Sequence, residues 1–375
     1  MRSLMRTLTA LLLTDGRPGH YHLSEGVIAA GRRLRSVDVV RLHVRRRGSG
    51  RLVALLSNAG CPADWLLRLA YGLTPSQIPP ADFIVSAGAE TLGASIAMAR
   101  LTGAPNIFCG TLRRYRPDGL SLVLTSYASH ARRPRHVMVL KPSALSRKDV
   151  ARFPTRLAGA AVPRTMGLLL GGQSGECRYD TDEWEQLLDF AERSYQTLGI
   201  RWVVSNSRRT PQAVSEMVAA RVAAGSGSIA SFIDVRITGP GTLGRVLERV
   251  EAVVCTDDSS TMISECVSAG LPVLGARPRR AKFTPDEQSY RAYLIGNGWH
   301  RSVPIAGLTP EVLLNEMAHI RPLTEDPLDH LATVIRERIP ELFSTYPAQA
   351  TYFDQRASRR AESRTSRRTS TLSPA

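Results

Sequence analysis

Lysine is scarce in this chain of 375 residues. Only Lys141, Lys148 and Lys282 occur among 49 basic residues, so arginine carries almost all of the positive charge, and the formal net charge is +16. Arginine suits bidentate contacts with phosphate. The codon bias of a GC-rich genome would produce the same preference without any function.

Cysteines are few, and their number is odd. The five cysteines lie far apart, and no CxxC pair occurs. This spacing argues against a zinc ribbon, a thioredoxin-type motif or a disulfide framework. Cys109 and Cys255 lie in or beside apolar, strand-like runs, so we expect reduced core residues in a cytoplasmic protein.

Long apolar runs are also missing. No stretch approaches the 18 or so apolar residues that a membrane span requires. The opening MRSLMRTLTALLLTDG has a short apolar run and no small-residue cleavage site, which favours a first buried strand over a signal peptide. Peripheral attachment to the inner face of a membrane stays open as an alternative to a purely cytoplasmic location.

Common nucleotide and nucleic-acid signatures are absent as well. The sequence has no G-x-G-x-x-G, no Walker A motif and only 6% aromatic residues. Net charge alone is a poor basis for nucleic-acid recognition, so we expect no nucleic-acid partner. The Arg/Ser-rich residues 355–375 lack apolar periodicity, which predicts a disordered tail.

Short apolar runs alternate with helical patterns along most of the chain. This alternation predicts parallel sheets with crossover helices, and two blocks of it predict two Rossmann-like, doubly wound domains facing across a cleft. We expect an N-terminal domain at residues 1–150 and a second domain at 151–345. A C-terminal segment at 346–375 would end in the tail. The strands are expected at 7–14, 38–44, 82–87, 106–110, 121–125, 136–140, 165–170, 201–205, 232–238, 252–256 and 272–275.

The first motif, DGRPGH, follows the first expected strand. Its glycines allow close approach of a ligand, and we expect a helix from residue 21 that directs free N–H groups toward an anion. His20 could act as a general base, and Asp15 could bind or orient a hydroxyl. An ordinary strand-to-helix turn is the alternative.

Two further motifs follow strands of the second block. GGQSG, with Gly172, Ser174 and Gly175, could surround a phosphate, and Arg178 lies just beyond it. In SNSRRTP, Arg208 and Arg209 would lie at a helix N-terminus that Thr210 caps, which suits a polyanion. A plain turn and two solvated arginines are the alternatives.

The fourth motif is TDDSSTMISECVSAGLPVL. Asp258 or Ser259 is expected to cap a helix over 260–269, with Ser260 and Thr261 at its start. Helical spacing places Thr261 and Glu265 away from the apolar face. Glu265 could then bind ribose hydroxyls while the helix start holds a diphosphate; a solvent-facing glutamate is the alternative.

The four motifs occur in one order that resembles a known family. Together, DGRPGH, GGQSGECRYD, SNSRRTP and DDSSTMISE are similar to the family named after a plant mitochondrial-fission factor ("elongated mitochondria"). The arrangement from GGQSG onward also resembles the nucleotide-sugar half of GT-B glycosyltransferases, in the style of the lipid-linked N-acetylglucosamine transferase of peptidoglycan synthesis. The resemblance implies a GT-B-like fold and a ribose-binding role for Glu265.

The same resemblance makes residues 151–345 the nucleotide-sugar side and residues 1–150 the acceptor side. Two departures from the family pattern fall on the acceptor side. Tyr21-His22 follows DGRPGH where the family tends toward Asn-Gln, and Ser129-His130-Ala131 stands where a His-Asp pair is expected.

These observations predict a sugar transferase that uses a nucleotide-diphosphate sugar and needs no cofactor or metal. The acceptor is unknown, and a lipid-linked one is an option. One alternative is a nucleotide-sugar epimerase. Another is a non-catalytic scaffold that binds membranes or proteins, because the basic run RLHVRRRGSGR and the apolar CPADWLLRLAYGL could sit on anionic lipid. A basic loop followed by a core helix explains the same segment.

Overall fold

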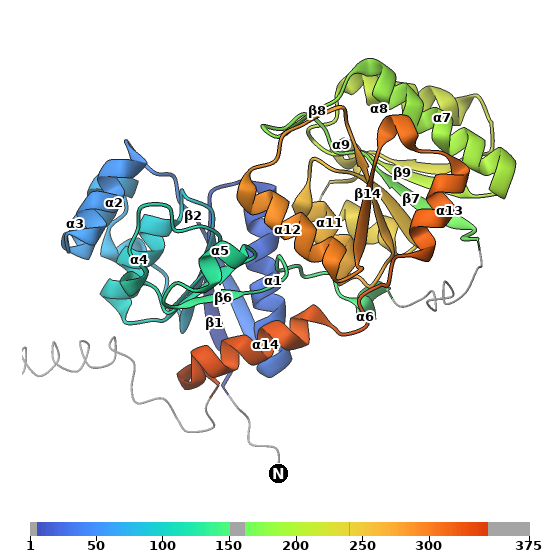
Figure 1. Cartoon of the computed structure of the whole chain (residues 1–375). Helices are drawn as coiled ribbons and strands as arrows, with labels where there is room; N and C mark the ends of the chain where they lie inside the picture. Colours follow the sequence, from blue (N-terminus) through green and yellow to red (C-terminus); the bar gives the residue numbers. More distant parts are fainter. Residues whose placement is uncertain (1–5, 151–161, 240, 344–375) are drawn as a thin grey trace, which may run out of the picture. The chain divides into compact units, whose positions relative to one another are not determined.

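The chain contains two α/β units, each built on a parallel sheet (Figure 1). The computed structural model describes residues 6–150, 162–239 and 241–343. The first unit comprises residues 6–125, 133–137 and 331–343 of this part, and the second comprises 126–132 and 138–330. The expected tail and most of the expected linker lie outside the described residues.

The sheet of the first unit has the strand order β2-β1-β3-β4-β5-β6. Its strands are β1 (Leu8–Thr14), β2 (Val37–His43), β3 (Phe83–Ala87), β4 (Asn106–Cys109), β5 (Leu122–Thr125) and β6 (His136–Met138). β1 pairs in parallel with both β2 and β3. The chain reverses its winding between β1 and β3, and in such sheets ligands bind outside the carboxyl ends of the strands at that reversal.

Helices cover the first sheet and complete its core. They are α1 (Pro18–Leu34), α2 (Gly50–Asn58), α3 (Ala63–Tyr71) and α4 (Leu92–Thr102). α14 (Pro327–Arg338) ends in this unit after starting in the other. α2, α3 and α4 pack on one another and bury Leu66, Leu67 and Met98.

The sheet of the second unit has the order β10-β9-β7-β11-β12-β14. Its strands are β7 (Thr165–Leu169), β9 (Arg201–Ser205), β10 (Ile229–Ile233), β11 (Ala252–Thr256), β12 (Val273–Arg277) and β14 (His300–Pro304), and all neighbours are parallel. Numbered within the unit, the order is 3-2-1-4-5-6, with the reversal between β7 and β11. β8 (Cys177–Arg178) and β13 (Arg280–Ala281) form a separate antiparallel pair.

The helices of the second unit are α5 (Ala128–Ala131), α6 (Arg147–Val150), α7 (Thr181–Leu198), α8 (Gln212–Ala223), α9 (Val235–Thr238), α10 (Thr242–Leu247), α11 (Ser260–Ser268), α12 (Pro285–Gly296) and α13 (Pro310–Ala318). α5 belongs here because side chains bind it to α12. The Tyr127 hydroxyl donates to Glu287 over 2.6 Å, and the Ser129 hydroxyl donates to Asp286 over 2.7 Å. Residues 126–132 and 138–150 therefore group with the second unit, although the sequence suggested a boundary at 150.

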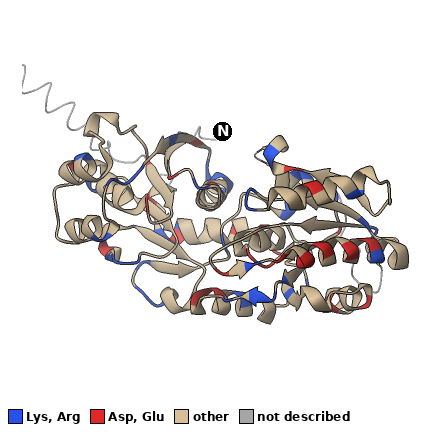
Figure 2. Ribbon diagram, turned by 90° about the horizontal axis from the view of Figure 1, so that it is seen from above, with Lys and Arg blue, Asp and Glu red and all other residues tan. Residues whose placement is uncertain are grey.

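The predicted α/β fold with two doubly wound sheets is confirmed. All five cysteines are free, and Cys109 and Cys255 are buried as expected. No helix in the described part of the chain is long and apolar enough to cross a membrane. Basic residues, blue in Figure 2, are spread over both units rather than gathered in one stripe.

Two expected elements differ from the structure. The strand expected at 232–238 is β10 at Ile229–Ile233 followed by the short helix α9, because the Asp234 side chain accepts from the backbone N–H of Arg236 and starts a helical turn there. The first helix was expected from residue 21. It begins at Pro18, whose fixed φ suits the first helical turn, and this places His20 inside that turn.

Candidate functional site

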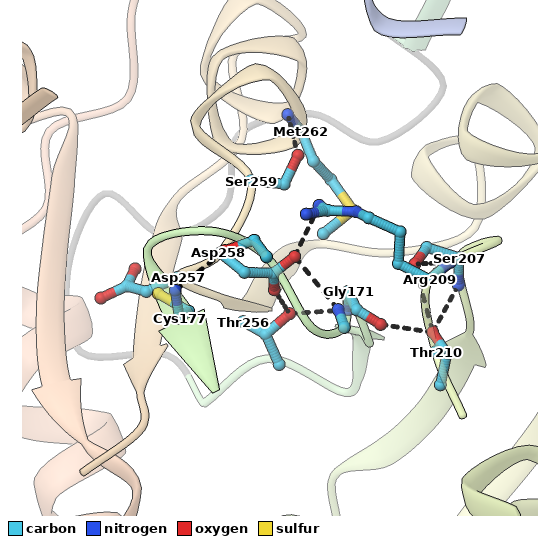
Figure 3. A network of polar contacts seen from close by, with 12 residues as sticks. Gly171, Cys177, Ser207, Arg209, Thr210, Thr256, Asp257, Asp258, Ser259 and Met262 are labelled. Atoms are coloured by element: carbon cyan, nitrogen blue, oxygen red, sulfur yellow. Dashed lines mark hydrogen bonds and ion pairs between the residues drawn. The ribbon is translucent and has the colours of Figure 1, made fainter. Parts of the chain in front are cut away.

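Three loops of the second unit meet at the reversal point of its sheet (Figure 3). They follow β9, β7 and β11, which are neighbours in the sheet. Because parallel strands present their carboxyl ends at one edge, the SNSRRTP, GGQSG and DDSS motifs lie together although they are up to 86 residues apart. This juxtaposition is the main feature of the candidate site.

Asp258 is the centre of this cluster. Its Oδ2 accepts from the backbone N–H of Gly172 at 3.0 Å and from the Arg209 guanidinium at 2.6 Å. Its Oδ1 accepts from the hydroxyls of Thr256 (2.7 Å) and Tyr179 (3.1 Å). Burial raises the pKa of Asp258, while Arg209 and the hydrogen bonds act in the opposite direction. Asp258 therefore fixes the three loops relative to one another.

Asp258 was one of the two residues expected to cap α11, and it does not cap that helix. Ser259 is the cap, and its hydroxyl accepts from the backbone N–H of Met262 at 3.3 Å. The neighbouring Asp257 is also engaged internally, since it accepts from the Ser302 hydroxyl and lies 3.4 Å from the Arg291 guanidinium. No group of three or more potential metal ligands occurs among the described residues.

Gly171 and Gly172, the first two residues of GGQSG, lie so close to neighbouring loops that no side chain fits at either position. A Cβ on Gly171 would lie 2.1 Å from a carboxylate oxygen of Asp258, and one on Gly172 would lie 2.1 Å from the backbone oxygen of Arg209. Neither glycine has a positive φ. The absent side chains allow the loops to touch. A Cβ on Gly175, by contrast, would meet nothing within 4 Å.

The backbone amides of this loop are largely engaged inside the protein. Gly171 donates to Thr256 Oγ1 at 2.6 Å, and Gly172 donates to Asp258. Ser174 donates its N–H to Cys177, and its hydroxyl accepts from the amides of Glu176 and Cys177. The loop therefore works mainly as a structured support, and few of its N–H groups remain for a phosphate.

The SNSRRTP motif contains one arginine that is paired inside the protein and one that is exposed. Thr210 is buried and donates to the carbonyl oxygen of Leu170, so its hydroxyl holds the GGQSG loop. It does not cap α8, whose N-cap residue is Pro211; that expectation was wrong. Arg209 is committed to Asp258. Arg208 and Arg178 are exposed and form no ion pair with another described residue.

The start of α11 carries a lysine that the sequence analysis did not assign. Lys141 Nζ donates to the Ser260 hydroxyl at 2.5 Å and to Glu287 Oε1 at 2.8 Å. It also lies over the rings of Tyr290 (4.7 Å) and Tyr127 (5.6 Å). Burial lowers the pKa of Lys141. Burial alone would raise the pKa of Glu287, but the Lys141 ammonium and its hydrogen bonds hold that pKa below its usual value.

Lys141 thus adds a cation to a helix N-terminus with free donors. The backbone N–H groups of Ser260 and Thr261 are in the first turn of α11 and have no acceptor within the helix. The positive end of the helix and the ammonium group reinforce each other there. The scarcity of lysine in the sequence was the only signal that could have singled out Lys141.

Glu265 lies one turn further along α11. It is only 7% exposed, and every residue from Ile263 to Ser268 is buried. The sequence placed Glu265 on the face of the helix away from the core, but Ser268 on that face is buried too, so α11 is enclosed on more than its apolar stripe. Glu265 is thus a buried carboxylate with protein contacts of its own.

The first unit has a second polar cluster at its own reversal point. Asp15 Oδ2 lies 2.8 Å from His20 Nδ1, with the Asp15 side chain 3% exposed and that of His20 31% exposed. Asp15 also accepts from the backbone N–H of Arg17 at 3.1 Å. The carboxylate fixes the ring and favours the Nδ1–H tautomer, so Nε2 is the nitrogen that can accept a proton.

The loop after β3 provides the space that His20 occupies. Gly88 has φ +86°, and a Cβ there would lie 2.2 Å from His20 Nδ1. This glycine therefore serves both its left-handed backbone and the position of the imidazole.

Comparisons with known proteins agree with this architecture. A putative UDP-N-acetylglucosamine 2-epimerase from Listeria monocytogenes superimposes with a TM-score of 0.55 and 12% identity, over 92% of this chain and 100% of that one. The S. aureus MnaA–UDP structure gives 0.50 and 10% identity over 92% and 100%. MurG from Acinetobacter baumannii superimposes with a TM-score of 0.48 and 13% identity, over 88% of this chain and 99% of that one. At these identities the first two superpositions show the fold alone, and the third, with a TM-score below 0.5, carries no argument.

The family itself is identified by sequence. No curated protein matches the chain significantly. The model of the family described as "Mitochondrial fission ELM1" matches residues 18–339, which include all but the first three residues of the DGRPGH motif and the whole of the other three. The chain belongs to the mitochondrial fission ELM1 family and has a GT-B-like fold.

Proposed function

We propose that this protein is a glycosyltransferase whose second unit binds a nucleotide-diphosphate sugar at the start of α11. The observation that carries the proposal is the position of Lys141. Its ammonium group is held at Ser260, where the free amides and the positive end of the helix already favour an anion. A diphosphate bound there would gain charge-assisted hydrogen bonds from a group fixed in advance by Glu287.

The same groups would stabilise the departing nucleoside diphosphate during sugar transfer. Negative charge develops on the diphosphate as the bond to the sugar breaks, and donors already in place stabilise it without reorganisation. Arg208 and Arg178 are exposed cations without ion-pair partners among the described residues, so they are available to the same ligand. Asp258, Arg209 and Thr210 would act indirectly, by holding the loops. Glu265 would accept hydrogen bonds from the ribose hydroxyls.

The first unit would provide the general base. His20 has one nitrogen fixed by Asp15 and a partly exposed ring, an arrangement suited to accept the proton of an attacking hydroxyl. Asp15 is then a positioning residue, because it contacts the imidazole rather than the substrate.

A thermal-shift titration tests the donor site. Wild type and the Lys141→Met and Glu265→Ala variants would be titrated with UDP, GDP, CDP and ADP. A ligand that binds only the folded state at 100 times its dissociation constant stabilises it by about 2.7 kcal/mol. We expect one diphosphate to raise the midpoint by several degrees, and both variants to reduce this shift.

The control is Lys282→Met, because Lys282 is the one other lysine outside α6 in the described part and its side chain is exposed. It removes the same charge without touching α11, so its shift should equal that of wild type. Absence of a shift with every diphosphate would contradict the donor site.

Epimerisation at the sugar is the second candidate, because two of the superpositions at a TM-score of 0.50 or above are with UDP-N-acetylglucosamine 2-epimerases by title. An epimerase converts its nucleotide sugar without an acceptor, whereas a transferase does not. NMR spectra of the nucleotide sugar incubated with protein alone separate the two: a new sugar epimer would favour epimerisation.

A further inference from the structure

The outward face of α2 and α3 in the first unit carries exposed apolar side chains. Leu52 and Leu55 on α2 are 55% and 64% exposed, and Trp65 and Leu69 on α3 are 62% and 64% exposed. These four side chains, called here the α2–α3 face, make up half of the eight large hydrophobic residues exposed in the described part of the chain. Single exposed leucines are ordinary, but a cluster on two adjoining helices marks an interaction surface.

Helical spacing keeps these residues apart from the core. Leu66, Leu67 and Tyr71 on α3 are buried, as are Val53 and Ala54 on α2. The sequence prediction of a core helix at CPADWLLRLAYGL was therefore correct for one side of α3 only. The opposite side has a separate role or none.

Exposed arginines lie on α2 and α3 and in the residues just before α2. Arg45, Arg47, Arg51 and Arg68 are all exposed. Between residues 45 and 72 the sequence contains one acidic residue, Asp64. Arginines can extend their charged ends to phosphate while their stems lie along apolar surface, and tryptophan favours the boundary between lipid and water.

We propose that the α2–α3 face docks on an anionic phospholipid bilayer. Trp65 and the leucines would enter the boundary between headgroups and acyl chains, and the four arginines would contact lipid phosphates. A second copy of the chain fits this surface poorly, since a twofold contact would bring the same arginines together. The inference is independent of the proposed transferase activity, and its test uses no nucleotide.

Tryptophan fluorescence gives a direct readout. The chain has four tryptophans. Trp184 and Trp202 are buried and Trp299 is half-buried, so Trp65 is the one that is largely exposed. With the full chain, vesicles of phosphatidylcholine containing phosphatidylglycerol should shift the emission to the blue, and brominated acyl chains should quench it. Phosphatidylcholine alone should do neither, and added salt should weaken the effect.

Variants locate the contact. The pair Leu55→Ser and Leu69→Ser keeps the Trp65 reporter and should weaken partitioning by at least about tenfold, because less apolar surface enters the bilayer. The pair Arg51→Gln and Arg68→Gln should weaken it by about tenfold or more through lost electrostatic attraction. Ile237→Ser is the matched control, since Ile237 is 87% exposed in the second unit and should not affect binding.

Each remaining outcome overturns the proposal. Co-sedimentation with vesicles but no change in Trp65 emission would place the contact elsewhere, such as in the basic residues 355–375. Binding that is unchanged by the leucine pair would do the same. A dimer that forms without vesicles and is lost in the leucine pair would assign the α2–α3 face to a second copy. If the protein is folded but does not bind the vesicles, the α2–α3 face has no role in lipid binding.

Discussion

Replacing Asp258 tests whether this carboxylate fixes the loops of the second unit. Asp258→Ala leaves the N–H of Gly172 and the hydroxyl of Tyr179 without their acceptor, and both are at buried or nearly buried positions. Each unsatisfied buried group costs about 1–3 kcal/mol. We therefore expect Asp258→Ala to lower the free energy of unfolding by about 2–6 kcal/mol. Arg209 adds little, because its side chain is 42% exposed and can turn to water.

Asp258→Asn is the matched comparison. An asparagine can point its oxygen at Gly172 and Arg209 and donate from its amide to the oxygens of Tyr179 and Thr256, which can accept. It should therefore cost at least about 1 kcal/mol less than alanine.

Urea unfolding followed by fluorescence measures both variants. In a Trp65→Phe background the remaining three tryptophans all lie in the second unit, so the signal reports that unit alone. Equal stabilities for the alanine and asparagine variants, or a loss below about 0.5 kcal/mol for alanine, would refute the reasoning, since such losses are typical of ordinary surface positions.

Three further predictions follow from single contacts. Gly172→Ala should destabilise the second unit by about 1–3 kcal/mol because its Cβ would meet backbone, whereas Gly175→Ala should be nearly neutral; equal urea midpoints would contradict this. Gly88→Ala should displace His20 from Asp15. The nitrogen chemical shifts of the His20 imidazole in NMR spectra would report this as a change in tautomer population. An unchanged spectrum would contradict the contact between Asp15 and His20. The lowered pKa of Glu287 means that its contribution to stability is present above the unfolded pKa of about 4.3 and is lost as pH falls through the folded value. The stability gap between wild type and Glu287→Gln, measured by urea unfolding, should therefore be constant near neutral pH and shrink below about pH 4; a gap that grows on acidification would reverse the sign.

Much of the fold could be predicted because local patterns and global topology agree. The strand at Arg201–Ser205 was expected with its exact bounds, and so was Ala252–Thr256. The loops that follow them lie together as a consequence of the predicted parallel sheet, because parallel strands end at one edge of a sheet. Ser259 was one of the two caps that the local sequence offered for α11, and it is the one observed.

Contacts between distant residues were beyond the sequence. Lys141 and Ser260 are separated by 119 positions, and nothing local in either segment indicates the other. Asp258 and Thr210 resemble helix caps in sequence, but tertiary partners in the GGQSG loop engage both side chains instead. Glu265 lies on the polar stripe of α11, and its burial depends on neighbouring elements that the helical period does not describe.

The central claim is that Lys141 and the start of α11 hold the diphosphate of a nucleotide. Isothermal titration calorimetry tests it most directly, with the nucleoside diphosphate selected by the thermal-shift panel and its monophosphate. In wild type the diphosphate should bind at least about tenfold more tightly than the monophosphate, because a charge-assisted hydrogen bond contributes about 1.5–3 kcal/mol. In Lys141→Met this preference should fall to near unity, while the monophosphate affinity changes little. A preference that survives in Lys141→Met would contradict the account, as would equal affinities for both nucleotides in wild type.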